Sequence, residues 1–154
     1  MHLRTKIKVG LVGAVVTGGG VAAALLGPAG PAVGQASQPI QVQIQVAPPA
    51  TLAAKGAALD VFVTTECSGP PGTTGSFSVG FTERSASGLA TGAGGGSVAC
   101  TGTSQTTLVV ATAAAGSKPF KRGTALMNAG ISACTPDFLT CAGQQVGPTT
   151  FPIK

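Results

Sequence analysis

The stretch IQVQIQV at residues 40–46 alternates apolar and polar side chains without a break. In an extended strand successive side chains point to opposite faces, so the four apolar residues share one face and the three glutamines share the other. Helical periodicity is absent from residues 37–154. The segment is therefore predicted to be a half-buried β-strand, and the rest of the chain is expected to build sheets around it.

Similar stretches recur between turn sequences that are rich in glycine, proline, serine and threonine. The predicted strands occupy residues 40–46, 59–67, 76–84, 88–100, 105–115, 123–134 and 147–153, and APPA after the first strand is interpreted as a turn. The glycines of the fourth strand predict a bulge or a loose edge, and two prolines confine the seventh to an edge. Seven short strands favour a single antiparallel β-sandwich of immunoglobulin-like architecture, although the tryptophan usual in immunoglobulin cores is missing. An up-and-down barrel is the alternative.

The first 36 residues have the three parts of a secretory signal peptide. A basic start with no acid is followed by an uncharged stretch at residues 9–26 and by the small residues that end at Ala36. A retained membrane anchor is the alternative, but residues 9–26 are at the short limit for a span. We predict that residues 1–36 are cleaved after Ala36 on a Sec-type route, because no twin arginine is present. Residues 37–154 are then one secreted, extracellular domain with no further span.

The charge of residues 37–154 is small, with six basic and four acidic residues and a net charge of +2. Most of the positive charge of the chain lies in the predicted signal peptide, so its basic isoelectric point is no argument for nucleic-acid binding. Three bases cluster around Phe120, namely Lys118, Lys121 and Arg122. This basic surface patch is a candidate contact for an anionic wall polymer or a membrane surface, and we favour a solvated turn between two strands.

Four cysteines follow residue 36, and in an oxidising space they are expected to form two disulfides. The direction in which each side chain faces selects among the three pairings. Cys67 and Cys100 lie on the core-facing side of their strands, whereas Cys134 lies on the opposite side of its strand. We therefore predict that Cys67 pairs with Cys100 and that Cys134 pairs with Cys141.

The stretch CTPDFLTC at residues 134–141 closes a loop of six residues between two cysteines. A redox centre is disfavoured by this spacing and by the adjacent acid Asp137. A zinc site would need all four cysteines, because the only histidine, His2, lies in the predicted signal peptide. The stretch is predicted to be a disulfide staple, with Asp137, Phe138 and Leu139 as a candidate recognition loop. The favoured interpretation is that Phe138 and Leu139 pack down onto the end of the sandwich.

The signal peptide, the single strand-rich domain, the composition rich in Ala, Gly, Thr and Val, and the turn CSGPPGT at residues 67–73 resemble small exported β-sandwich proteins of actinomycetes. Those proteins are mostly uncharacterised, so the resemblance implies a fold and a location but no activity. The chain is more distantly similar to the neocarzinostatin-type apoproteins, which are secreted seven-stranded sandwiches with two disulfides that hold an enediyne chromophore. The short-loop pair Cys134 and Cys141 is similar in kind, and the first pair is spaced differently.

Several chemistries are disfavoured by the residues that are missing. Without histidine, residues 37–154 have no Ser-His or Cys-His nucleophile pair and no imidazole base. The four carboxylates are scattered, and Glu66 and Glu83 are interpreted as surface residues rather than as a glycosidase pair. No phosphate-binding loop is present, and Gly94-Gly95-Gly96 is interpreted as a flexible segment. Without Tyr or Trp there is no ready platform for stacking sugars. The sequence therefore predicts that the protein is not an enzyme and carries no metal or cofactor.

Two classes of function remain consistent with these residues. The first is a secreted, disulfide-stapled, non-catalytic binding or structural module of the cell envelope or extracellular space, with an unknown protein or cell-envelope partner. The alternative is a small-molecule carrier of the chromophore type, with a ligand cleft in the sandwich. A carrier is expected to show a concave apolar cleft and to co-purify with an absorbing compound. The sequence names neither the partner nor the oligomeric state.

Overall fold

The computed structural model describes residues 38–86 and 88–154, so the predicted signal peptide lies outside the described residues. The elements are β1 (Gln41–Ala53), the short 3-10 helix η1 (Ala54–Gly56), β2 (Ala58–Ser68), β3 (Thr74–Ser85), β4 (Gly88–Ala99), β5 (Ser104–Ala113), β6 (Gly123–Cys134) and β7 (Cys141–Ile153). All seven predicted strands are present, and this part of the chain is all-β. Within it, no helix is long and apolar enough to cross a membrane.

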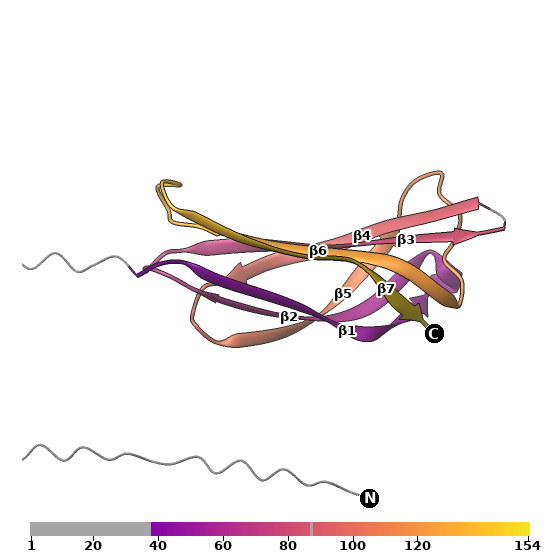
Figure 1. Cartoon of the computed structure of the whole chain (residues 1–154), viewed down its shortest axis with the longest axis horizontal. Coiled ribbons are helices and arrows are strands. Elements are labelled where there is room, and N and C mark those ends of the chain that lie inside the picture. The colour runs from indigo at the N-terminus through magenta and orange to yellow at the C-terminus, as the bar shows by residue number, and fades with distance from the viewer. Residues whose placement is uncertain (1–37, 87) are drawn as a thin grey trace, which may run out of the picture. The chain divides into compact units, whose positions relative to one another are not determined.

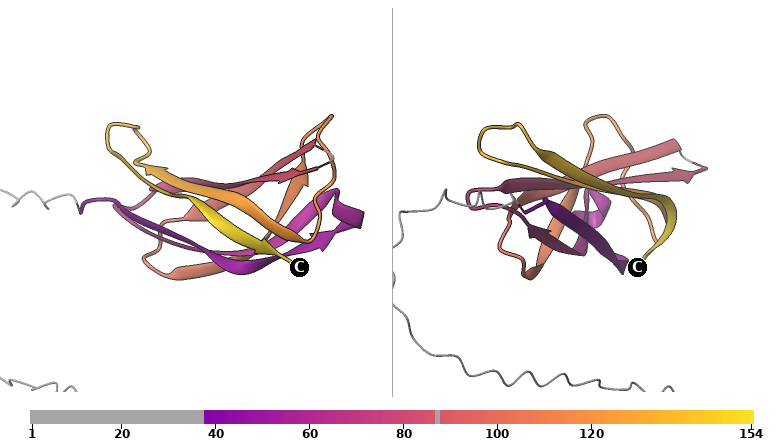
Figure 2. Two further views of the ribbon diagram at one scale, coloured as in Figure 1. Left: turned by 45° about the vertical axis from the view of Figure 1, so that its right-hand side comes forward. Right: turned by 60° about the vertical axis from the view of Figure 1, so that its left-hand side comes forward.

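The strands form one closed barrel in the order β1-β2-β5-β4-β3-β6-β7 (Figures 1 and 2). Because β2 lies beside β5 and β3 beside β6, this order differs from that of an up-and-down barrel. Two short seams close the barrel. Strands β4 and β5 pair only at Gly92↔Ala113 and Ala93↔Thr112, and β1 and β7 pair in parallel at Ala50↔Ile153. The expected pair of separate sheets is therefore joined into one, because β1 and β4 each contact strands on both of their edges.

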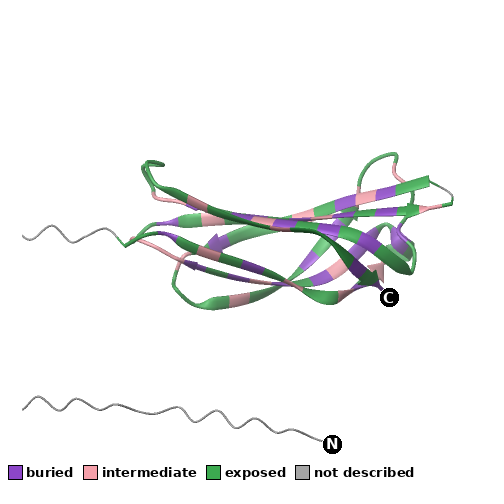
Figure 3. Cartoon of the chain, in the orientation of Figure 1, coloured by how far each residue is buried: buried purple, intermediate pink, exposed green. Residues whose placement is uncertain are grey.

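The barrel interior follows the alternation that was read from the sequence, with inward buried and outward residues succeeding one another along β2, β3 and β6 (Figure 3). The largest fully buried side chains are Phe81, Leu59, Val61, Val63, Val79 and Cys67. The rings of Phe81 and Phe151 meet edge to face, with centroids 5.6 Å apart. Burying each of these aliphatic and aromatic side chains contributes about 1.5–3 kcal/mol to the free energy of folding.

Strand β1 is longer than predicted, because APPA is not a turn. The strand continues to Ala53, and its register with β2 shifts between Ala47 and Thr51. Proline has no N–H to donate, and a bulge lets a strand pass such residues without breaking. Strand β7 is also longer than predicted and begins at Cys141, since its ladder with β6 starts at the pair Cys134↔Cys141.

Both predicted disulfides are present. Cys67 is bonded to Cys100 and Cys134 to Cys141, with Cα–Cα distances of 4.3 and 4.1 Å. In the chain-entropy model, cross-links of these two loop lengths contribute about 4 and about 2.5 kcal/mol to stability. Two disulfides in one small domain are typical of a protein of an oxidising, extracellular environment.

The glycines of β4 have a structural role that the sequence analysis missed. The ladder between β3 and β4 runs without a bulge from Thr74↔Ala99 to Ser85↔Gly88. A Cβ atom on Gly94 would lie 2.6 Å from the carbonyl oxygen of Val110 in β5. The predicted bulge is therefore wrong, and the interpretation of this segment as flexible stays a prediction. Glycine is required here because β4 and β5 approach closely where the barrel closes.

Candidate binding site

The loop at residues 134–141, which we call the knob, projects from the end of the β6–β7 hairpin on the outer side of the sheet (Figure 1). The disulfide between Cys134 and Cys141 closes its base. Inside the loop, the Thr135 N–H donates to the Thr140 carbonyl and the Phe138 N–H donates to the Thr135 carbonyl, each at 2.9 Å. The knob is therefore an ordered turn held at its base by both covalent and hydrogen bonds.

Asp137 organises the tip of the knob. Its carboxylate accepts hydrogen bonds from the Thr135 hydroxyl and, at 3.2 Å, from the Leu139 N–H. Both bonds stabilise the charged form and hold the pKa of Asp137 below its ordinary value, and the bond from Thr135 has the larger effect. The predicted recognition residue Asp137 thus shapes the loop while its charge remains exposed to solvent.

The two apolar residues of the knob point into solvent. Phe138 is 78% exposed and Leu139 is 85% exposed, so the expectation that they pack onto the barrel end is wrong. Phe138 has a left-handed backbone, with φ of 58°, and the bond from Leu139 to Asp137 fixes the following residue. The contact with the barrel is made instead by Pro136, whose ring lies 2.9 Å from the position that a Cβ atom on Gly72 would occupy.

Beside the knob lies a shallow hollow of about 540 Å³ on the outer face of β3, β6 and β7. We call it the polar hollow. The residues that line it are uncharged, and they include the apolar Phe77 and Ile131 as well as Ser76, Ser78, Gly130, Ser132, Gly143 and Gln145. A smaller hollow of about 250 Å³ continues it along β6 past Asn128 to Pro148. The knob thus stands at one end of a strip of hydroxyl and carboxamide groups.

The polar hollow escaped the sequence analysis, although a signal for it was present. Three outward positions of β3 and β6 are the serines Ser76, Ser78 and Ser132, and Gly130 is a further small residue on the same face. Small uncharged residues on two paired strands leave a flat surface. The sequence shows the small residues, but only the fold shows that β3 pairs with β6.

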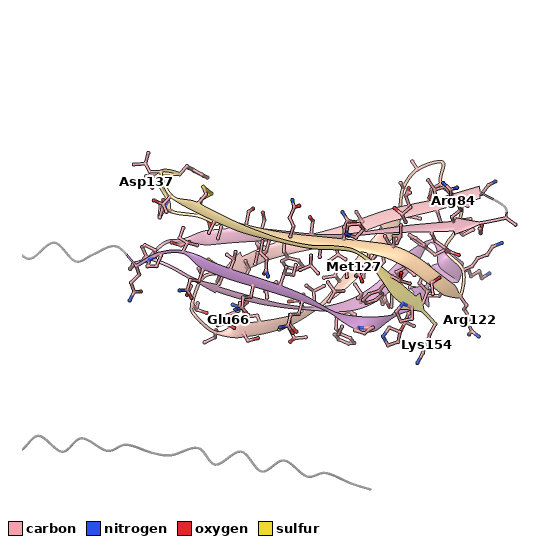
Figure 4. The ribbon with its side chains drawn as sticks, in the orientation of Figure 1. Glu66, Arg84, Arg122, Met127, Asp137 and Lys154 are labelled. Carbon is pink, nitrogen blue, oxygen red and sulfur yellow. A yellow bond between two sulfur atoms is a disulfide. The ribbon has the colours of Figure 1, made fainter. Side chains whose placement is uncertain are left out.

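The predicted basic patch lies elsewhere. Lys118, Lys121 and Arg122 are exposed in the connection between β5 and β6. This connection is tied down, because the buried Phe120 donates its N–H to the Gly56 carbonyl at 2.8 Å and the Lys118 N–H donates to the carbonyl of Leu89. Figure 4 shows Arg122 and Asp137 at opposite ends of the barrel. The patch is an ordered turn and is not part of the same surface as the knob.

Glu83 is not the surface residue that was predicted. It faces the barrel interior and is only 6% exposed, and its carboxylate accepts a 2.8 Å hydrogen bond from the backbone N–H of Lys121. Its position two residues after the inward-facing Phe81 was the signal for this burial. Glu66 is exposed on β2, so these two carboxylates do not face a common cleft. In the described part of the chain, no three His, Cys, Asp or Glu side chains gather as metal ligands would.

Comparisons of the chain with protein-family models, with curated proteins and with solved structures found no match. The resemblances to exported actinomycete β-sandwich proteins and to neocarzinostatin-type apoproteins therefore stay predictions.

Proposed function

We propose that this chain is a secreted, non-catalytic binding module of the cell envelope or extracellular space, and that the knob and the polar hollow together bind a protein partner. The observation that carries the proposal is the exposure of Phe138 and Leu139 on a loop that is closed by a disulfide and ordered by Asp137. A loop that served only as a staple would not need two large apolar side chains in solvent.

The rigidity of the knob favours recognition. Binding costs free energy when side chains and loops become ordered, and a preorganised loop avoids much of that cost. A few side chains that are fully enclosed in a pocket on the partner can supply most of the affinity of an interface. Phe138 and Leu139 are adjacent and exposed, so a partner with one apolar recess can enclose both.

The polar hollow defines the rest of the partner surface. Ser76, Ser132 and Gln145 can each donate and accept hydrogen bonds, and the residues that line the hollow carry no charge. An uncharged polar strip on the partner satisfies these groups, whereas an apolar strip would leave them without hydrogen bonds. The partner surface is therefore apolar opposite the knob and polar but uncharged opposite the hollow.

The fold and location are part of the proposal. The two short seams separate a three-stranded layer, β1-β2-β5, from a four-stranded layer, β4-β3-β6-β7. This arrangement supports an immunoglobulin-like sandwich whose layers meet at both edges. The two disulfides support export, and the features of residues 1–36 support a cleaved signal peptide. A chromophore carrier is less well supported, because the hollows beside the knob are shallow and serine, asparagine and glutamine make up part of their lining.

The test measures binding of the fluorescently labelled protein to the surface of the cells that secrete it. A double variant, Phe138→Ser with Leu139→Ser, is expected to bind at least about tenfold more weakly, as the loss of an anchor pair predicts. Its melting temperature should stay close to that of the parent, because both side chains are exposed. Arg122→Ser removes a long exposed side chain from the opposite end of the barrel and serves as the control.

Undiminished binding by the double variant would overturn the proposal. Treatment of the cells with a protease before labelling identifies the class of partner, and loss of binding supports a protein. Binding that survives the protease but disappears after digestion of the wall polysaccharide would show that the partner is a glycan. A tightly held absorbing compound in the intact mass of the secreted protein would favour the carrier instead.

A further inference from the structure

An apolar patch lies on the outer face of the layer formed by β1, β2 and β5. Phe62, Leu108 and Val110 are 55%, 51% and 52% exposed. Phe62 lies directly opposite Leu108 across the β2–β5 ladder, and Ala47 of β1 flanks it on the other side. We call these four residues the apolar patch. Scattered exposed apolar residues are normal, but neighbours on one sheet face are typical of an interaction surface.

A second apolar surface lies on the other layer, at the end away from the knob. It is a hollow of about 310 Å³ whose lining includes Leu89, Leu126, Thr82, Thr124, Thr150 and Arg84. We call it the leucine hollow. Leu126 lies opposite Thr82 on β3, and Leu89 lies opposite Arg84. The leucine hollow shares no residue with the knob or the polar hollow.

The two surfaces carry opposite charges. On the patch side, Asp60 precedes Phe62 by two residues on the same strand face, and Glu66 follows further along β2. On the hollow side, the only charged residue of the lining is Arg84. Figure 4 shows Glu66 and Arg84 on opposite sides of the barrel. Two apolar patches therefore repel each other, as do two leucine hollows, whereas a patch and a hollow attract each other.

The distance between the charged residue and the apolar residue is also similar on the two surfaces. Residues two apart on one strand face are separated by about 7 Å, as Asp60 and Phe62 are. Arg84 and Leu126 are diagonal neighbours across the β3–β6 ladder, for which the separation is about 7–8 Å. A side chain at the position of Phe62 can thus meet Leu126 while the carboxylate of Asp60 meets the guanidinium of Arg84.

We propose that the occupant of the leucine hollow is the apolar patch of a second copy of this chain, with Phe62 in the hollow and Asp60 beside Arg84. The two surfaces are different and lie on different layers, so each copy can bind one neighbour through its patch and another through its hollow. Such a head-to-tail contact does not close on itself unless the rotation between copies closes a ring. The chain therefore associates into short open rows, and the knob and polar hollow are not used in the contact.

The association is weak and depends on concentration. The patch has four apolar residues, which is small beside the 20–30 residues a side of a standard protein interface, so we expect a dissociation constant between roughly 1 μM and 1 mM. Local crowding at a cell surface would then favour rows over single copies. The contact includes a charge pair, so it should weaken as salt is added.

The first test measures mass against concentration by sedimentation for the secreted protein and for two variants of it, Phe62→Asp and Leu126→Asp. Each variant alone is expected to stay monomeric. An equimolar mixture should give one-to-one pairs and nothing longer, because only the patch of the Leu126→Asp copy and the hollow of the Phe62→Asp copy are intact. A Leu126→Asp variant that still forms dimers would overturn the proposal, since it would show that patch binds patch.

The second test uses charge. Asp60→Arg and Arg84→Asp are each expected to abolish the rise in mass, and the double variant is expected to restore it, because the pair is then reversed rather than lost. Phe138→Asp, which places the same charge on the knob, should leave association unchanged and is the matched control. Unchanged melting temperatures exclude unfolding as the cause. A parent protein that stays monomeric up to roughly 1 mM, or a double variant that is not restored, would sink the proposal.

Discussion

The backbone N–H of Ile44 in β1 donates a 2.9 Å hydrogen bond to the side-chain oxygen Oε1 of Gln144 in β7. Strand β1 uses its other edge to pair with β2, and its backbone pairing with β7 is confined to Ala50↔Ile153. A glutamine side chain therefore caps the exposed edge of the most regular strand in the sequence. Edge strands are the usual sites of unwanted pairing, and proteins protect them with specific devices.

Removal of this cap is expected to lower stability. Gln144→Leu leaves the Ile44 N–H without its acceptor, and the free energy of unfolding should fall by about 1–3 kcal/mol. Urea titration followed by circular dichroism measures the change. Gln145→Leu is the control, because the side chain of Gln145 lies on the outer face rather than at the seam. Equal losses in the two variants would show that the Ile44 hydrogen bond contributes nothing specific.

The same edge predicts how the protein aggregates. Residues 40–46 combine strong β-propensity with no charge, which is typical of segments that stack on copies of themselves. After reduction of both disulfides, the protein is expected to form β-rich aggregates, and Gln43→Lys should slow their growth. Gln43 is exposed and lies opposite Glu66, so a lysine there is compatible with the fold. Thioflavin fluorescence measures the rate.

The control for that experiment is Thr106→Lys, which adds the same charge to β5 on the same layer. Aggregation by the Gln43→Lys variant as fast as by the parent would contradict the prediction. A reduced parent that remains monomeric would do so as well.

The close approach of β4 and β5 predicts a steric effect. Gly94→Ala places a methyl group 2.6 Å from the Val110 carbonyl oxygen, and overpacking of this kind costs about 1–3 kcal/mol. The free energy of unfolding should fall accordingly. Gly130→Ala is a matched control on β6, since its Cβ atom would find its nearest neighbour at 3.7 Å. Equal stability of the two variants would mean that β5 moves away at little cost.

The buried carboxylate of Glu83 predicts a local effect on the β5–β6 connection. Glu83→Ala removes the acceptor of the Lys121 N–H, and the free energy of unfolding should fall by about 1–3 kcal/mol. Glu83→Gln retains an oxygen at the same place and should lose less. Hydrogen exchange at the Lys121 amide reports the bond directly, and it should accelerate in the alanine variant. Identical exchange in both variants would count against the bond.

The knob is expected to loosen in acid. The hydrogen bonds to Asp137 lower its pKa in the folded state, so the charged carboxylate stabilises the knob above the ordinary aspartate pKa of about 4. This contribution is lost as the pH falls through the lowered pKa. Carbon NMR of the carboxyl group measures the titration, and amide exchange at Leu139 should accelerate over the same range. Thr135→Val removes the main cause of the shift and should raise the pKa of Asp137.

An unshifted pKa of Asp137 in the parent would contradict the hydrogen bonding of the knob. A Thr135→Val variant that titrates like the parent would place the cause elsewhere.

Local patterns were sufficient to predict the strands and the disulfides. The period of two in IQVQIQV and in the stretch around Phe77 and Phe81 decides which side chains face inward, and that parity also separated Cys67 from Cys134. These features depend on a few neighbouring residues, and extended backbone geometry converts spacing into direction. The same parity marked Glu83 as an inward residue, although its charge led to the opposite interpretation.

The sequence by itself determined that the described part of the chain is all-β, which apolar side chains of β2, β3 and β6 face inward, and which cysteines pair, because these properties follow from spacing along the chain. Only the tertiary structure decided that the barrel closes, that Gly94 is needed for β5 to approach, and that Gln144 reaches Ile44. It also decided that Phe138 and Leu139 stand in solvent, since Pro136 rather than either of them contacts the barrel end. Each of these depends on contacts between residues far apart in the chain, and no local pattern encodes the distance between two strands.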